Sequence, residues 1–244
     1  MRIMPKFFFH KNDISRGQIQ LFGEDEKHIK TVLRAREGEE ITLCDGEGMD
    51  YQCRIASLER GVLLDILSKE VCETEPKTKI PLYQGLPKGD KMELIIQKCV
   101  ELGVDRIVAV STERAIVKLD KKEAKKLERW QKIAESAAKQ SGRGKIPEIG
   151  QQVLKFKEAV AEAKELDGAI IPYEREEETG IRQFVENFKG ESVGVFIGPE
   201  GGFADEEIAL AQENGITPIT LGKRILRTET AGMTTTAILL YELD

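Results

Sequence analysis

The chain has 244 residues, of which 40% are hydrophobic and 33% are charged, and its formal net charge is −6. This length can bury a sizeable core in one large domain or in two unequal ones. No apolar run approaches the roughly 20 residues needed to span a bilayer, and the first residues lack the apolar region and cleavage site of a signal peptide. A membrane protein and a secreted protein are therefore disfavoured, and we expect a cytoplasmic one.

Short β-type segments dominate the first 72 residues. They lie at 6–9, 18–22, 40–43, 51–55 and 61–66, and one helix with apolar positions at helical spacing is expected at 25–35. The pattern predicts a small β-barrel domain over residues 1–72. A polar, proline-containing stretch without periodicity follows, and we interpret residues 73–79 as a linker.

Strands and helices alternate in the rest of the chain, over residues 80–244. Strands are expected near 80–86, 106–112, 167–173, 193–198 and 216–221, and helices near 90–102, 121–141, 155–165, 204–214 and 228–242. This alternation predicts an α/β domain with a mainly parallel sheet.

Four cysteines and two histidines leave little material for a metal site. The cysteines are scattered at positions 44, 53, 72 and 99 without a C-x-x-C pair, and the histidines lie at 10 and 28. Zinc sites and disulfide frameworks use closely spaced ligands or paired cysteines. We expect free, buried thiols and no metal.

Two glycine-containing loops near the C-terminus each follow an apolar strand. The first, Gly198-Pro199-Glu200-Gly201-Gly202, follows residues 193–197, and the second covers residues 221–227. Glycine permits positive φ and a close approach of ligand to backbone, and ligands bind at the carboxyl ends of strands in α/β sheets. One such loop could be a tight strand-to-helix turn. Two loops around one expected crevice favour a ligand site.

The familiar nucleotide and hydrolase motifs are missing. The chain has neither G-x-x-x-x-G-K-[ST] nor a G-x-G-x-x-G after the first strand of the α/β domain, and no G-x-S-x-G elbow. What remains is a pocket of backbone groups and aliphatic side chains, which suits a flat base. Its expected contributors are Ile171, Pro172, Gly198, Pro199, Glu200, Gly201, Leu221, Gly222, Ile225 and Leu226.

Charged residues flank this expected pocket. Thr228 is a good N-cap for the last helix, and Glu229 in its first turn would complement the helix dipole. For both residues a purely structural role and a functional role stay open. Arg224 and Arg227 are the nearest cations, and for Arg227, which is set among aliphatic residues, we favour function.

A basic stretch runs from Lys121 to Lys145, with nine lysines and arginines against three glutamates. Runs of this kind are usually solvated helix faces. Phosphate binding is the sharper alternative, since the local surplus of positive charge contrasts with the acidic chain as a whole.

The sequence GPEGGF followed by LGKRILRTETA resembles the signature of the RsmE-type methyltransferases, which belong to the SPOUT superfamily. The resemblance covers nearly the whole chain. It includes HIKTVLR at 28–34, DGEG at 45–48, residues 91–104, Glu113-Arg114 and QSGR at 140–143. Lys6 and Ala115 depart from it, because arginine and serine are more usual there.

The resemblance implies an enzyme that methylates N3 of a uridine in 16S ribosomal RNA of the small ribosomal subunit, with S-adenosyl-L-methionine as cofactor. It implies a PUA-like RNA-binding domain, a SPOUT-type α/β domain with a trefoil knot, and a homodimer whose subunits share the active site. The expected cofactor contacts are Ile171, Pro172, Gly198, Pro199, Glu200, Gly201, Leu221, Gly222, Ile225, Leu226, Arg227, Thr230 and Ala231. The expected catalytic residues are Arg227, Glu229 and Glu200, and the expected RNA contacts are Lys6, Arg34, Lys121, Lys125, Lys126, Arg143 and Arg224.

Three alternatives stay open. The chain could be a non-catalytic RNA-binding or ribosome-assembly factor on the same fold, although its intact GPEGG and RTETA runs argue against this. It could be a nucleotide-dependent enzyme, which the missing phosphate-loop lysine disfavours. Within the methyltransferase hypothesis, either carboxylate could accept the uridine proton. Alternatively, Arg227 or backbone N–H groups could stabilise the anion while solvent takes the proton.

Overall fold

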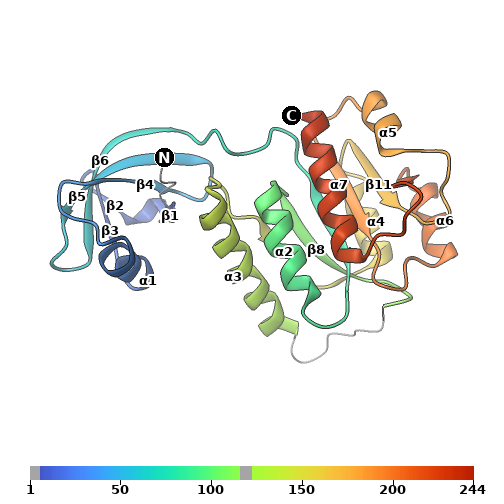
Figure 1. Ribbon diagram of the computed structural model, residues 1–244, viewed down its shortest axis with the longest axis horizontal. Coiled ribbons are helices and arrows are strands. Elements are labelled where there is room, and N and C mark those ends of the chain that lie inside the picture. Colours follow the sequence, from blue (N-terminus) through green and yellow to red (C-terminus); the bar gives the residue numbers. More distant parts are fainter. Residues whose placement is uncertain (1–5, 116–122) are drawn as a thin grey trace. The chain divides into compact units, whose positions relative to one another are not determined.

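The computed structural model describes residues 6–115 and 123–244, which form two compact units (Figure 1). The first unit holds the described residues up to Glu75 together with Ala138–Ile146, and the second holds the rest. The boundary after Glu75 falls inside the predicted linker. The prediction divided the chain into consecutive domains, so it did not include Ala138–Ile146 in the first unit.

A six-stranded sheet forms the first unit, with the order β1-β4-β5-β6-β3-β2. All its neighbouring strands are antiparallel except β1 and β4, which are parallel. The path has two ends, β1 and β2, rather than the closed ring of the predicted barrel. The strands are β1 Phe7–Phe8, β2 Ile14–Ser15, β3 Gln18–Leu21, β4 Glu40–Cys44, β5 Met49–Ser57 and β6 Val62–Val71.

The predicted helix at 25–35 is shorter and irregular. It consists of α1 Glu24–Lys27 and a π-helical stretch, His28–Leu33, and a 3₁₀ turn, Lys11–Asp13, precedes β2. The π-helical stretch ends at Arg34, whose φ of 54° lies in the left-handed region. Its apolar side packs on the sheet, because Ile29 is fully buried in the core of this unit.

A buried ion pair attaches the segment Ala138–Ile146 to the first unit. The Arg143 guanidinium donates to the Glu75 carboxylate at 2.7 Å, and the backbone N–H groups of Gly144 and Lys145 donate to the same side chain at 2.8 and 3.1 Å. Burial alone would raise the pKa of Glu75, but the bonds from Arg143 and the two amides outweigh it and lower that pKa. Glu75 is therefore held as a carboxylate.

A parallel sheet forms the second unit, with the order β10-β8-β7-β12-β11-β13, and β9 also pairs with β8. Because parallel strands are covered on both faces, β7 and β12 are buried at every residue. The strands are β7 Pro81–Gly85, β8 Arg106–Ser111, β9 Glu148–Ile149, β10 Leu154–Lys155, β11 Gly168–Pro172, β12 Val193–Ile197 and β13 Thr217–Ile219. The helices are α2 Lys91–Leu102, α3 Glu123–Ser141, α4 Phe156–Ala163, α5 Ile181–Asn187, α6 Asp205–Glu213 and α7 Thr228–Leu243.

Helices cover both faces of this sheet. On one face, α4 and α6 pack on a cluster that includes Tyr83, Ile171 and Phe196. On the other face, α2 and α7 lie side by side, and α7 also contacts β12 (Figure 1). Adjacent residues of a strand point to opposite faces, so Gln84 in β7 points away from Tyr83, toward α7. The predicted strand–helix alternation is confirmed, and α5 is an addition to it.

Candidate functional site

A cavity of about 800 Å³ lies at the carboxyl ends of β11, β12 and β13. Three segments surround it: the chain after β11, the glycine-rich loop after β12, and the stretch from β13 into α7. Its size is typical of sites for small ligands. The lining residues are Lys91, Pro172, Tyr173, Glu174, Glu176, Glu177, Ile197, Gly198, Pro199, Glu200, Gly202, Phe203, Thr220, Leu221, Gly222, Lys223, Arg224, Ile225, Leu226, Arg227, Thr228 and Ala231.

Glycine is required at two points of the wall. Gly202 and Gly222 have φ of 67° and 102°, in the region that residues with a side chain rarely adopt. Gly85, at the end of β7, supports the wall from behind. A Cβ atom on Gly85 would lie 2.7 Å from Pro199 Cδ and 2.9 Å from Pro199 N. The missing side chain lets the loop after β12 pack directly against β7.

A buried hydrogen-bond chain holds the start of α7. The Thr228 hydroxyl donates to the Gly198 carbonyl at 2.6 Å, and Gln84 Nε2 donates to Thr228 Oγ1 at 2.9 Å. Thr228 is therefore not the N-cap that the sequence suggests. Arg227 occupies that position, with φ −67° and ψ 153°, and the Thr228 hydroxyl faces the loop instead of the helix amides.

A lysine connects the two predicted catalytic carboxylates. Lys91 Nζ lies 2.8 Å from Glu200 Oε1 and 3.6 Å from Glu229 Oε2. Glu200 also accepts a hydrogen bond from the Lys88 backbone. Burial alone would raise the pKa of Glu200, but the bonds from Lys91 and the backbone outweigh it, so this pKa is lowered. Glu229 Oε2 is buried and accepts no hydrogen bond from any described group.

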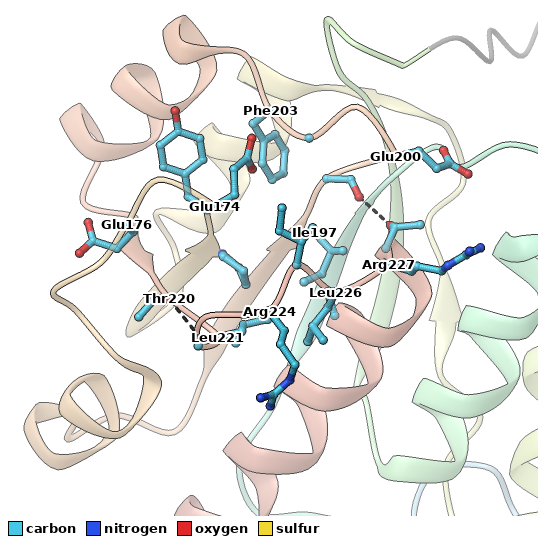
Figure 2. A pocket seen from close by; sticks show the side chains of 18 of the residues that line it. Glu174, Glu176, Ile197, Glu200, Phe203, Thr220, Leu221, Arg224, Leu226 and Arg227 are labelled. Carbon is cyan, nitrogen blue, oxygen red and sulfur yellow. Dashed lines mark hydrogen bonds between the residues drawn. The ribbon is translucent and has the colours of Figure 1, made fainter.

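Arg224 and Arg227 are exposed and point in different directions at the rim of the cavity (Figure 2). Within the described part of the chain, neither side chain makes an ion pair. Ile225, between them, also lines the cavity and is 88% exposed, which is unusual for a large aliphatic side chain. The rim thus presents cationic and apolar groups together.

An acidic stretch after β11 is a part of the wall that the sequence interpretation missed. Glu174, Glu176 and Glu177 line the cavity with Tyr173, and Figure 2 shows Glu174 beside Phe203. A run of glutamates usually indicates a solvated surface, so these residues were not predicted to line the cavity. The available clue was its position, directly after a predicted strand of a parallel sheet.

Ten of the thirteen predicted cofactor contacts line the cavity, and three do not. Ile171 is fully buried in the core under α4 and α6, because its side chain, like that of Ala169, points to that face of β11. The Gly201 carbonyl accepts a bond from Arg114 at 3.4 Å, and Thr230 is exposed on α7. The lining contains Pro172, Gly198, Pro199, Glu200, Leu221, Gly222, Ile225, Leu226, Arg227 and Ala231.

The structure engages two of the predicted RNA contacts in ion pairs. The side chain of Arg143 is only 5% exposed and pairs with Glu75, so it does not present its charge at the surface. The Lys6 ammonium lies 2.6 Å from Asp50 and 3.0 Å from the Cys72 sulfur, and its side chain is 13% exposed. Their basic character alone could not reveal these partners, which are distant in the sequence.

The other predicted RNA contacts that the structure describes have exposed side chains. Lys125 and Lys126 are exposed on α3, and Arg34 is exposed at the end of the π-helical stretch. Arg224 is exposed at the rim of the cavity. Lys121 lies outside the described residues.

Comparisons with known proteins decide the family. A family model described as an RNA methyltransferase domain matches residues 74–240, and a model of an RNA methyltransferase PUA domain matches residues 23–67. The chain is 36% identical to Ribosomal RNA small subunit methyltransferase E from Bacillus subtilis, over 99% of this chain and 98% of the relative. The chain belongs to this methyltransferase family.

Solved structures agree with this assignment. Ribosomal RNA small subunit methyltransferase E from Neisseria gonorrhoeae, bound to S-adenosyl methionine, superposes with a TM-score of 0.86 at 35% identity, over 98% of this chain and 97% of that one. A Legionella pneumophila protein in complex with the bound cofactor SAM gives 0.83 at 36% identity, over 97% and 96%. The α/β fold with a PUA-like domain and the family resemblance are thereby confirmed.

No group of three or more His, Cys, Asp or Glu side chains is placed to hold a metal ion among residues 6–115 and 123–244. No helix in these ranges is long and apolar enough to cross a membrane.

Proposed function

We propose that the protein methylates N3 of a uridine in 16S ribosomal RNA of the small ribosomal subunit, with S-adenosyl-L-methionine as the methyl donor. The observation that carries this proposal is the cavity at the carboxyl ends of β11, β12 and β13. Two findings support this placement: a relative that matches over the whole chain is named as a ribosomal RNA methyltransferase, and a solved structure of the same fold is bound to S-adenosyl methionine. We place the activity in the cytoplasm.

The cavity fits the chemistry of this cofactor, which carries an adenine, a ribose diol, a sulfonium and an amino-acid end. Apolar residues on several sides, Pro172, Leu221 and Leu226 among them, suit the adenine. Four carboxylates and four cationic side chains also line the cavity, so both a cationic and an anionic ligand group can find a partner. The carboxylates are Glu174, Glu176, Glu177 and Glu200, and the cations are Lys91, Lys223, Arg224 and Arg227.

When bound, the cofactor supplies a methyl group activated by a sulfonium. The protein contributes alignment, because in-line displacement needs the reacting atoms held at near-attack distance. It must also take up the imide proton of the uridine or stabilise the resulting anion. Glu229 fits the role of proton acceptor better than Glu200 does. Glu200 accepts hydrogen bonds from Lys91 and from the Lys88 amide, whereas Glu229 Oε2 lies 3.6 Å from Lys91 Nζ and accepts no hydrogen bond from a described group.

The substitution Glu229→Gln tests this role. It removes the proton-accepting carboxylate while keeping its shape, so we expect turnover to fall by about 10²–10⁴-fold. The Kd for the cofactor should change less than about threefold, in line with a group that acts on the uridine. Single-turnover methylation and calorimetric titration measure the two quantities. Glu242→Gln, an exposed position on the same helix, is the matched control. Near-normal turnover of E229Q with intact cofactor binding would remove Glu229 as the proton acceptor and leave either Glu200, or solvent with Arg227 or backbone N–H groups stabilising the anion.

The basic face of α3 is proposed as an RNA phosphate contact, supported by the exposure of Lys125 and Lys126. Reversing both charges (K125E/K126E) should weaken RNA binding by at least tenfold at low salt and flatten its salt dependence, with cofactor affinity unchanged. Filter binding at several salt concentrations measures this. The matched control is K157E/K189E, which makes the same change of charge at two exposed lysines of the second unit. Equal RNA affinity in the two double variants would show that the α3 face is merely solvated.

Three finer features complete the proposal. We propose that residues 1–72 act as the RNA-binding domain and 80–244 as the methyltransferase domain, joined by 73–79. We propose a SPOUT-type trefoil knot in the second, supported by the enclosure of one cavity by three separate segments. We also propose a homodimer, supported by exposed large hydrophobic side chains on the neighbouring helices α2 and α7, Leu94, Leu102 and Tyr241.

Titration with S-adenosyl-L-methionine and with ATP, followed by a methylation assay, tests the proposed function. We expect the first ligand to bind and the second to fail, and we expect methyl transfer to 16S RNA or to small subunits at one uridine. Binding without transfer to either substrate would favour a non-catalytic RNA-binding or assembly factor. Binding of ATP alone would favour a nucleotide-dependent enzyme.

A further inference from the structure

We propose that Gln84 and Thr228 are positioning residues of the methyl-transfer site. Their side chains form a buried hydrogen-bond chain that fixes the first turn of α7 against the loop after β12. The proposal rests on the proposed function, because that turn carries Arg227 and Glu229. It assigns a role to Gln84, which lies outside the cavity lining.

The direction of every bond in this chain follows from the atoms involved. The Gly198 carbonyl can only accept, so the Thr228 hydroxyl hydrogen must point to it, over 2.6 Å. Thr228 Oγ1 then accepts from Gln84 Nε2 at 2.9 Å. The same nitrogen donates to the Gly85 carbonyl at 2.9 Å. Turning the amide over would place its oxygen against the Gly85 carbonyl oxygen, so one orientation alone is compatible.

The burial of Gln84 indicates more than core packing. The side chain is 0% exposed on a strand whose neighbours are mostly apolar, and Gln84 Oε1 finds no hydrogen-bond partner among the described groups. An unsatisfied buried oxygen opposes folding, and an aliphatic side chain of similar size would avoid that cost. The amide nitrogen of Gln84 offsets this cost, because its two N–H groups donate to the Gly85 carbonyl at the end of β7 and to Thr228 Oγ1 at the start of α7.

The hydrogen bonds of Gln84 and Thr228 join three parts of the fold that are far apart in sequence. Gln84 comes from β7, Gly198 follows β12, and Thr228 begins α7. Gly198 and Thr228 both line the cavity, so the bond between them sets the distance between two of its walls. Since Arg227 and Glu229 flank Thr228, their backbone positions depend on the same bond. Loss of these hydrogen bonds should therefore disturb the alignment of Arg227 and Glu229 more than the overall stability of the protein.

The test compares Thr228→Val, Gln84→Met and the conservative Thr228→Ser. The matched control is Thr235→Val on the same helix, because the Thr235 hydroxyl is also buried but makes no hydrogen bond to a described group. We measure kcat, KM, cofactor Kd, the melting temperature and amide hydrogen exchange of the first turn of α7.

We expect T228V and Q84M each to lower kcat at least tenfold and to raise exchange in the first turn at least tenfold, with melting temperatures close to that of T235V. T228S should retain kcat within about threefold of the native protein. The double variant Q84M/T228V should be no worse than the poorer single variant, because the two residues act as one chain.

Two outcomes would overturn the positioning role. One is a kcat for T228V that matches T235V, and the other is first-turn exchange in T228V equal to that of the native protein. The proposed function fails separately, if the native protein does not bind the cofactor. Hydrogen exchange then still decides whether the hydrogen bonds of Gln84 and Thr228 fix the start of α7.

Discussion

Methionine in place of Arg143 is expected to lower the free energy of unfolding by about 3–5 kcal/mol, because it leaves the Glu75 carboxylate buried without its cation. The Glu75 side chain is 12% exposed and that of Arg143 is 5% exposed, so little water can replace the lost partner. The two remaining amide donors, from Gly144 and Lys145, do not neutralise the charge. Urea denaturation followed by circular dichroism measures the change.

Arg129→Met is the matched control for this prediction. Arg129 also pairs with a glutamate, Glu93, at 2.7 Å, but its side chain is 65% exposed. Exposed pairs contribute only about 0–1 kcal/mol. A loss in R143M no greater than that in R129M would show that burial adds nothing to the Arg143 pair.

Alanine in place of Gly85 is expected to raise the cofactor Kd at least tenfold, provided that the cavity is the cofactor site. The added Cβ would lie 2.7 Å from Pro199 Cδ and 2.9 Å from Pro199 N, closer than real contacts allow. The backbone of the loop after β12 must therefore move, and Gly198, Pro199 and Glu200 in that loop line the cavity. Displacements of about 1 Å at such sites can cost about a hundredfold in rate. Calorimetric titration measures the Kd.

Gly180→Ala controls for the general effect of adding a methyl group. Gly180 is the N-cap residue of α5, has φ −82°, and has no atom within 4 Å of the added Cβ position. G180A should bind the cofactor like the native protein. Native affinity in G85A would mean that the loop can shift without changing the cavity.

The fold could be predicted from the sequence because its signals are local. Apolar runs such as Val193–Ile197 and the glycines after them give strands and loop positions within a few residues of the observed ones. The short strands β9 and β10 were not predicted, because two residues carry no measurable periodicity. The irregular helix after Gly23 was predicted as one regular element, since its apolar spacing does not distinguish an α-helix from a π-helix.

The site was predictable where backbone geometry defines it and not where distant partners do. Gly198 and Gly222 could be predicted as loop residues of the site, because glycines directly after apolar strands indicate such loops. The sequence does not reveal the direction of Ile171, because a strand covered on both faces has no polar face to mark which residues point toward a cavity. Gln84 lies 144 residues from Thr228, so nothing local connects the two. Arg143 looked like a surface cation until Glu75, 68 residues away, proved to be its partner.

The return of Ala138–Ile146 to the first unit makes that unit discontinuous along the chain. Residues 76–137 are in effect an insertion within it, and α3 belongs to both units. A gene fragment ending at Glu75 would therefore encode an incomplete domain, which contains Glu75 but lacks its partner Arg143. Exchange of this domain between relatives would need three recombination points, so the two units are expected to be inherited together.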